Sequence, residues 1–464
     1  MLFNSLQFLV FFAFVISFYY ALPHRSRWLL LLLASSYFYM VFVPVYVLIL
    51  FGVILIDYLA AFLINRNRGF LRKLFLGLSL TANLGILCYF KYYNFFLENI
   101  SLLLNTFHVT NPLPFINVIL PIGLSFHTFQ AMSYTIEVYR GNQKPEKHIG
   151  IYALYVLFFP QLVAGPIERP QNLLPQLKKE QIYSKLNLRT GLILMAWGFF
   201  KKVVIADRLA VVVDHCYANV YSHSTSDMWL GVFFYSIQIY CDFSGYSDIA
   251  RGAAKMMGID LMENFKNPYL STSLTEFWRR WHISLSTWFR DYIYIPMGGS
   301  RVSAKKICFT ILVVFLLSGL WHGAKYTFLV WALIHAIFLI LEHFLKEKKE
   351  TPANFFVTSI RILYVFIITT LAWVFFRSQN INEALAVLTK LFSANSPHWE
   401  PIPMNLNELI FCFVLILVLL SFEKIIKTLN TLHSKKYYTA LWFLIISCYL
   451  FGIFNYKQFI YFQF

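Results

Sequence analysis

Long apolar runs alternate with short groups of basic residues along this 464-residue chain. A transmembrane helix needs about 20 mostly apolar residues. Candidate helices lie at residues 3–22, 28–43, 45–64, 74–97, 115–138, 192–204, 228–240, 307–320, 324–345, 360–376, 409–422 and 440–454. The pattern predicts an all-α polytopic membrane protein with about 11 transmembrane helices and additional re-entrant or in-plane helices.

Two apolar runs, residues 151–164 and 307–320, are short for a full crossing. About 14 residues at a rise of about 1.5 Å each span roughly 21 Å, whereas the hydrocarbon core is about 30 Å thick. We therefore expect a re-entrant or in-plane helix at residues 151–164. If Lys305 and Lys306 mark the cytoplasmic surface, the second run places His322 partway across the bilayer.

The basic groups predict the orientation of the chain. Arg25, Arg27 and the group at residues 66–73 follow apolar runs, and the positive-inside rule assigns such loops to the cytoplasm. The basic group at residues 346–349 is expected on the same side, and the proline-containing run at residues 396–405 outside. Both termini are then expected outside.

Composition supports a membrane protein and excludes several classes. Hydrophobic residues make up 59% and charged residues 13% of the chain, against roughly 45–50% and 25% in soluble proteins. We expect one integral membrane domain over residues 1–464. The net charge of +17 is divided among loops, which favours membrane lipid headgroups over nucleic acid. No Cys-x-x-Cys pair, zinc-like Cys/His cluster or P-loop occurs, so we expect no metal and no tightly bound cofactor.

Charge and tryptophan are concentrated between Ser271 and Gly323, in the run TEFWRRWHISLSTWFRDYIYIPMGGSR and in SGLWHG after it. Ser273 and Glu276 have the spacing of a capping box, which predicts a helix from Leu274. On one continuous helix, the side chains Arg279, His282, Ser286 and Arg290 would share a face. Such a polar face inside a membrane lines water or substrate; the alternative is an interfacial helix with snorkelling arginines and belt tryptophans.

His322 lies between Trp321 and Gly323 and is the favoured general base. Burial favours a neutral imidazole, which can accept a proton. The alternative is a histidine that is hydrogen-bonded across helices. A structural role is preferred for the other histidines without a polar cluster around them, namely His127, His215, His223, His335 and His343.

Two further polar runs interrupt the apolar pattern. CDFSGYSD contains Asp242 and Asp248, whose spacing does not put them on one helical face, so hydrogen bonding to neighbouring arginines is preferred over acid/base catalysis. GPIERP contains Glu168 and Arg169 between two prolines and is interpreted as a shaped turn with a gating role as a further option.

These motifs resemble the membrane-bound O-acyltransferase (MBOAT) family, and within it the bacterial alginate O-acetylation branch. The resemblance rests on GPIERPQNLLPQ, CDFSGYSDIARG, the MENFKNPYLSTSLTEFWRRWHISLSTWFRDYIYIPMGGSR run, SGLWHGAKYTFLVWALIHA and FIYFQF. D-alanyl transferases of teichoic acid modification are more distantly similar. Tyr326, Ala332 and Ala336 differ from residues common in the branch, which implies a narrower tunnel.

The resemblance implies a helical bundle around a central tunnel in the bacterial inner membrane, with a catalytic core at about residues 115–345. It implies that His322 is the essential histidine and His282 its partner. The expected substrate-contacting or tunnel-lining residues are Trp281, Trp321, Arg279, Arg280, Asp242, Ser286, Arg290 and Asp291.

The resemblance also implies the reaction. Acetyl-CoA or another acyl thioester is the expected cytoplasmic donor, and a periplasmic serine-hydrolase-like acetyltransferase is the expected acceptor that serves an exopolysaccharide. Within the same class, D-alanyl or peptidoglycan acyl transfer is the alternative. A polysaccharide or solute transporter is the alternative from another class, since polar intramembrane residues also line permeation paths.

Overall fold

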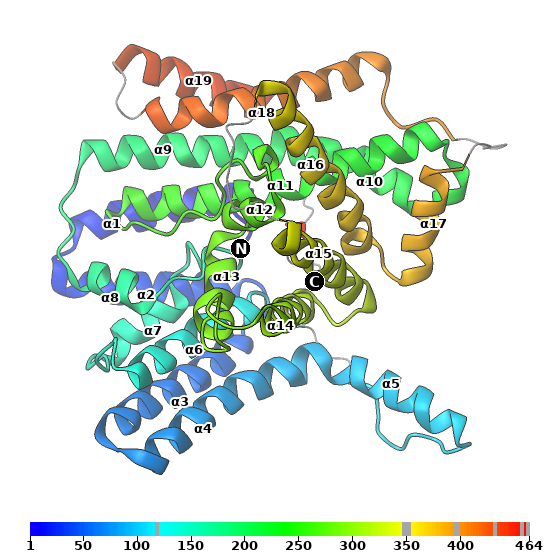
Figure 1. Ribbon diagram of the computed structural model, residues 1–464. Coiled ribbons are helices and arrows are strands. Elements are labelled where there is room, and N and C mark those ends of the chain that lie inside the picture. The colour runs from blue at the N-terminus through cyan, green and yellow to red at the C-terminus, as the bar shows by residue number, and fades with distance from the viewer. Residues whose placement is uncertain (117–119, 346–353, 394–399, 430–433, 455–458, 461–464) are drawn as a thin grey trace. The chain divides into compact units, whose positions relative to one another are not determined.

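The computed structural model describes all residues except 117–119, 346–353, 394–399, 430–433, 455–458 and 461–464. The basic group at 346–349, part of the proline-containing run and the last four residues of FIYFQF therefore lie outside the described residues. The described chain consists of helices joined by turns, without a β-strand (Figure 1). This confirms the all-α prediction. The chain forms two compact units, residues 1–195 with 249–262 and residues 196–248 with 263–464.

The first unit contains the N-terminal helices. They are α1 (Leu6–Ala21), α2 (His24–Met40), α3 (Tyr46–Arg66), α4 (Gly69–Leu87), the π-helix η1 (Cys88–Tyr92), α5 (Tyr93–Thr106), α6 (Leu124–Arg140), α7 (Ile149–Leu157), α8 (Pro170–Lys178) and most of α9 (Lys185–Phe199). The run at residues 151–164 is a helix only as far as Leu157. At about 1.5 Å per residue, the nine residues of α7 are far too short to cross a bilayer.

The second unit holds residues 196–248 and 263–464. Its elements are η2 (Phe200–Ala206), α10 (Asp207–Ala218), η3 (Val220–Ser222), most of α11 (Thr225–Met256), η4 (Pro268–Leu270), α12 (Leu274–Arg280), α13 (Ile283–Phe289), the π-helix η5 (Arg290–Tyr294), α14 (Ala304–His322), α15 (Tyr326–Leu345), α16 (Phe355–Arg377), α17 (Ile381–Leu391), α18 (Leu406–Leu429) and α19 (Ser434–Phe451). Within this unit α15 packs against α14, α16 and α12.

Six helices among the described residues are long and apolar enough to span a membrane. They cover Tyr46–Arg66, Gly69–Thr106, Ala304–His322, Tyr326–Leu345, Phe355–Arg377 and Leu406–Glu423. The protein is therefore a multi-pass membrane protein, and the count of about 11 crossings remains a prediction. Large apolar side chains such as Leu48, Leu363 and Leu417 are exposed on these helices, as expected where lipid is the solvent.

Several boundaries were predicted wrongly. α6 begins at Leu124 and not at residue 115, and α11 continues through the CDFSGYSD run to Met256 and does not end at residue 240. The apolar run at residues 307–320 belongs to a 19-residue helix, α14, which begins at Ala304 and ends at His322. Lysine is a good helix former, so the helix extends back through Lys305 and Lys306. At about 1.5 Å per residue, the 19 residues of α14 rise about 28 Å, close to the hydrocarbon core of about 30 Å. The helix is therefore long enough to cross a membrane, and its length does not place His322 partway across the bilayer.

Candidate active site

His322 is the last residue of α14, and its imidazole lies in an aromatic pocket. The ring centroids of Trp321, Trp331 and Phe376 lie 5.0, 5.2 and 5.1 Å from that of His322. The side chain is buried. Gly323 then leaves the helix in extended conformation and donates its backbone N–H to the carbonyl of Gly319 at 3.2 Å. The helix end therefore fixes the backbone from which the imidazole projects.

Gly319 allows α14 and α15 to approach closely. A Cβ at this position would lie 2.6 Å from the carbonyl oxygen of Phe328 and 2.9 Å from Cβ of Ala332. Since α15 also carries Trp331, this contact sets how close Trp331 lies to His322. Ala332 thus packs towards α14; its predicted effect on tunnel width is not tested by this contact.

His282 interrupts the helix that the sequence predicted. Ser273 caps α12 as expected, its Oγ accepting the backbone N–H of Glu276 at 3.1 Å. The helix ends at Arg280, and His282 adopts a left-handed conformation (φ 43°, ψ 54°) before α13 begins. The prediction of one continuous helix was therefore wrong.

Residues 264–266 explain this break. Lys266 donates its backbone N–H to the carbonyl of Arg280 at 3.0 Å, and Ile283 donates to the carbonyl of Asn264 at 3.0 Å. The side-chain oxygen of Asn264 accepts the backbone N–H of Ser284 at 3.1 Å. These bonds occupy backbone groups that a continuous helix would pair internally, and they turn His282 away from the face of Arg279.

The His282 imidazole is buried against aromatic rings. Its centroid lies 4.6 Å from Phe243 and 5.9 Å from Trp321. Burial lowers the pKa of His282 to about 3, because desolvation disfavours the charged form. His282 is therefore neutral at physiological pH. Trp321 contacts both His282 and His322, so the two predicted histidines lie against the same indole ring.

The aromatic cluster contains a third histidine to which the sequence analysis assigned only a structural role. His335 of α15 is fully buried, with its ring 5.2 Å from Trp331 and 4.9 Å from Trp278. Neither ring nitrogen of His335, nor Nε1 of Trp331, has a hydrogen-bond partner within the described part of the chain. His335 lies thirteen residues after His322, a spacing that does not link the two residues on a helix. A polar residue in an apolar membrane segment is nevertheless a signal for a functional site.

Trp281 forms the other side of this cluster. Its ring contacts Phe277, Phe265 and Trp373 at 5.5, 5.1 and 5.0 Å. Trp373 donates its indole N–H to the hydroxyl of Tyr269 at 3.2 Å, and Tyr269 donates to the carbonyl of Ser236 at 2.6 Å. Trp281 is thereby held by packing on several elements of the second unit.

The predicted polar face does not converge on the histidines. Arg279 and Arg290 are exposed, whereas His282 is buried. Arg280 pairs with Glu276 at 2.5 Å, and Arg290 pairs with Asp291 at 2.8 Å. Ser286 donates its hydroxyl to the carbonyl of Trp281 at 3.2 Å. Roles of these side chains towards a substrate remain predictions.

Asp242 belongs to a buried ionic network. One carboxylate oxygen of Asp242 pairs with Lys202, and the other accepts the backbone N–H of Ile460 at 2.7 Å. Lys202 also pairs with Asp207 at 3.0 Å, and the adjacent Lys201 pairs with Asp248 at 2.7 Å. Both carboxylates thus pair with lysines of η2, which the prediction of arginine partners did not include. In the sequence, two adjacent lysines within an apolar run, Lys201 and Lys202, were the signal for such buried ion pairs.

Glu168 organises the GPIERP turn in the first unit. Its carboxylate accepts the backbone N–H of Met262 and the side-chain amide of Asn172, the latter at 2.7 Å. Burial raises the pKa of Glu168 to about 7. The shaped turn is thus held by a buried carboxyl; a gating role remains a prediction.

Fold and site together define a class: a multi-pass helical membrane protein with buried histidines in an aromatic cluster. Comparison with known proteins narrows this class. The membrane-bound O-acyltransferase family model matches residues 69–382. The chain therefore belongs to the MBOAT family and is a membrane O-acyltransferase.

Curated relatives cover most of the chain. It is 39% identical over 414 residues to the probable alginate O-acetylase AlgI of Pseudomonas putida, covering 88% of this chain and 83% of that protein. The peptidoglycan O-acetyltransferase of Helicobacter pylori is 36% identical over 395 residues, covering 79% and 73%. The teichoic acid D-alanyltransferase of Bacillus subtilis is 29% identical over 266 residues, covering 54% and 67%.

Proposed function

We propose that this O-acyltransferase moves an acetyl group from a cytoplasmic thioester, acetyl-CoA, to a hydroxyl acceptor that serves an alginate-like exopolysaccharide. The single observation that carries the mechanism is the burial of His322 and His282 around Trp321. The similarity to an alginate O-acetylase along most of the chain supports acetyl as the acyl group. The acceptor is a periplasmic serine-hydrolase-like acetyltransferase, and the enzyme lies in the inner membrane with both termini outside.

His322 is the general base of this reaction. Its neutral imidazole takes the proton of the acceptor hydroxyl while the hydroxyl oxygen attacks the thioester carbonyl carbon. The resulting tetrahedral intermediate collapses when the carbon–sulfur bond breaks. The proton on the imidazole then passes to the leaving thiolate, which leaves as the free thiol.

The developing oxyanion needs donors in a water-poor site. The indole N–H groups of Trp281 and Trp321 and the imidazole of His282 are candidates for this role. Trp331 adds a further candidate, because its ring lies 5.2 Å from His322 and its N–H has no acceptor among the described residues. Trp331→Phe and Trp321→Phe each keep an aromatic ring, although a smaller one, and remove the N–H. Loss of an oxyanion donor lowers the rate about 10²- to 10³-fold, which identifies the donor.

The decisive experiment replaces His322 by alanine in cells that make the O-acetylated polymer. General-base catalysis contributes about 10²- to 10⁴-fold, so O-acetyl content should fall to background while the protein remains in the membrane. His343→Ala is the matched control, since His343 is exposed on the same helix hairpin, on α15. Normal O-acetylation in the His322→Ala strain would contradict the mechanism.

Transfer from labelled acetyl-CoA in proteoliposomes separates the alternatives. An enzyme places the label on an acceptor, whereas a transporter only moves solute across the bilayer. An acyl donor carried by an acidic protein would instead bind with a salt-sensitive affinity. The 36% identity to a peptidoglycan O-acetyltransferase makes peptidoglycan the second candidate acceptor. His282→Ala at an unchanged transfer rate would restrict His282 to a structural role.

A further inference from the structure

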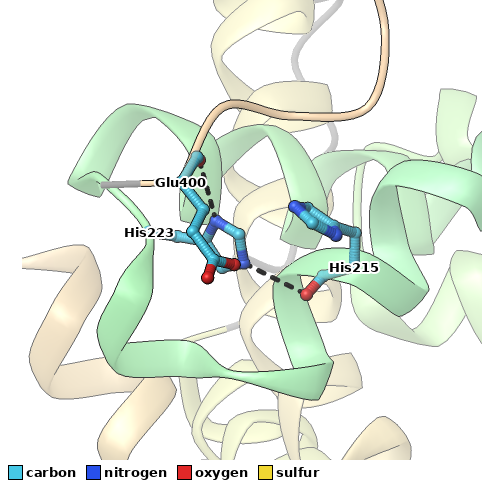
Figure 2. A group of neighbouring side chains, drawn as sticks. All are labelled: His215, His223 and Glu400. Atoms are coloured by element: carbon cyan, nitrogen blue, oxygen red, sulfur yellow. Dashed lines mark hydrogen bonds between the residues drawn. The ribbon is translucent and has the colours of Figure 1, made fainter. Parts of the chain in front are cut away.

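Three chain segments of the second unit bring two histidines and a carboxylate together, apart from the candidate active site. His215 lies in the last turn of α10, His223 follows η3, and Glu400 precedes α18. Figure 2 shows the three side chains gathered around His223. One nitrogen of each imidazole and a carboxylate oxygen of Glu400 lie within 4.8 Å of one another, and the two rings are 4.8 Å apart.

The hydrogen bonds of His223 create a need for positive charge. Its Nδ1 lies 3.3 Å from the carbonyl oxygen of Glu400, and its Nε2 lies 3.1 Å from the carbonyl oxygen of His215 (Figure 2). A neutral imidazole has one N–H to donate, so the lone pair of its other nitrogen faces an oxygen that also carries lone pairs. His223 is fully buried, where such a repulsion is not screened by water. A cation beside that nitrogen removes it.

A second observation points to a ligand at the same place. Nε2 of His215 is buried and has no hydrogen-bond partner among the residues that the structure describes. A buried nitrogen without a partner costs about 1–3 kcal/mol. Glu400 supplies the anionic group, and its backbone N–H donates to the carbonyl of Ser222 at 2.7 Å, which fixes it beside His223.

We propose that His215, His223 and Glu400 bind a divalent transition-metal ion, zinc in particular. Two imidazoles and one carboxylate are a donor set that zinc takes in proteins. Histidine ligands usually donate their other N–H to a carbonyl or carboxylate, as His223 does here. In a tetrahedral site with bonds of about 2.0 Å, ligand atoms lie about 3.3 Å apart, so the side chains need to close by about 1.5 Å at most. The exposed Glu400 side chain has room to do so.

The sequence analysis predicted no metal because the ligands lie at positions 215, 223 and 400, which form no recognisable spacing. Bound zinc connects the end of α10 and η3 to the segment that enters α18. This role is separate from acyl transfer, since none of the three residues belongs to the candidate active site. The ion therefore acts as a clamp on this end of the second unit.

The test uses the full chain, purified with a histidine-free tag, stripped with EDTA and titrated with zinc chloride. We expect one zinc per chain by mass spectrometry of bound metal. Loss of a hydrogen-bond partner behind a metal ligand already costs about 10- to 100-fold in affinity, so His215→Ala and Glu400→Gln should weaken binding more than about 100-fold. Zinc should also raise the melting temperature of the wild type but not of Glu400→Gln.

His343→Ala and Glu408→Gln are the matched controls, because both residues lie outside this cluster and their side chains are exposed (His343) or partly exposed (Glu408). They should bind zinc like the wild type. A wild type that takes up no zinc would overturn the proposal and would indicate that a proton supplies the charge beside His223. Equal affinities of the wild type, His215→Ala and Glu400→Gln would overturn it as well.

Discussion

Gly319→Ala tests whether the close contact of α14 and α15 positions the catalytic histidine. The new methyl would lie 2.6 Å from the carbonyl oxygen of Phe328 and 2.9 Å from Cβ of Ala332. Both atoms are rigidly attached to α15, so the helices have to separate by several tenths of an ångström. Overpacking of this kind costs about 1–3 kcal/mol. The same shift moves His322 relative to Trp331, and small misplacements at a reacting centre cost as much as about 100-fold in rate.

The assay measures the melting temperature in detergent and the rate of label transfer from acetyl-CoA. Gly77→Ala is the matched control, because it is also a helical glycine in a membrane-length segment and no atom lies within 4 Å of its added Cβ. Alanine at such a position is neutral or stabilises by up to about 1 kcal/mol. The reasoning is refuted if Gly319→Ala matches Gly77→Ala in both stability and rate. Ala332→Gly added to Gly319→Ala should restore only part of the loss, since the Phe328 carbonyl contact persists.

Two further predictions concern buried charges. Asp242→Asn keeps an acceptor for the Ile460 N–H but leaves Lys202 with Asp207 alone. Breaking a buried ion pair costs about 3–5 kcal/mol, so the melting temperature of this variant should fall clearly. The control Asp260→Asn, in an exposed ion pair, should change the free energy of unfolding by at most about 0.5 kcal/mol. Glu168 has its pKa raised from 4.5 to about 7, so the folded state holds the proton more tightly and loses stability as pH rises from about 4.5 to 7, by about 3 kcal/mol at 1.4 kcal/mol per pKa unit. Glu168→Gln cannot ionise and should flatten the melting temperature between pH 5 and 8; a slope equal to that of the wild type would contradict this account.

The lengths of the apolar runs predicted the helical membrane fold, because a bilayer leaves few alternatives for a long apolar segment. The capping residue Ser273 and the start of α12 were also local signals and were predicted correctly. The break at His282 was not predictable locally, because it depends on backbone bonds from Asn264 and Lys266. The residue pattern of a helix does not show that backbone groups elsewhere in the chain will take over its hydrogen bonds.

For the site, His322 and His282 were predicted from their motifs, and the structure places both against Trp321. The exposed positions of Arg279 and Arg290 follow from the same helix break and were therefore missed. His335 was undervalued because its partners, Trp278 and Trp331, come from two different helices. Contacts between helices decide which side chains cluster, whereas a single sequence predicts only the helices themselves.

The bond from the Ile460 N–H to Asp242 has a consequence for biosynthesis. The two residues are separated by 218 positions along the chain. At a translation rate of about 5–20 residues per second, Asp242 is synthesised roughly 10–40 s before this donor exists. During that interval the carboxylate of Asp242 on α11 already has its partner Lys202 of η2 but lacks one of its hydrogen bonds. Asp242 therefore acquires its full set of hydrogen bonds only after Ile460 has been made, long after the other members of this charged site.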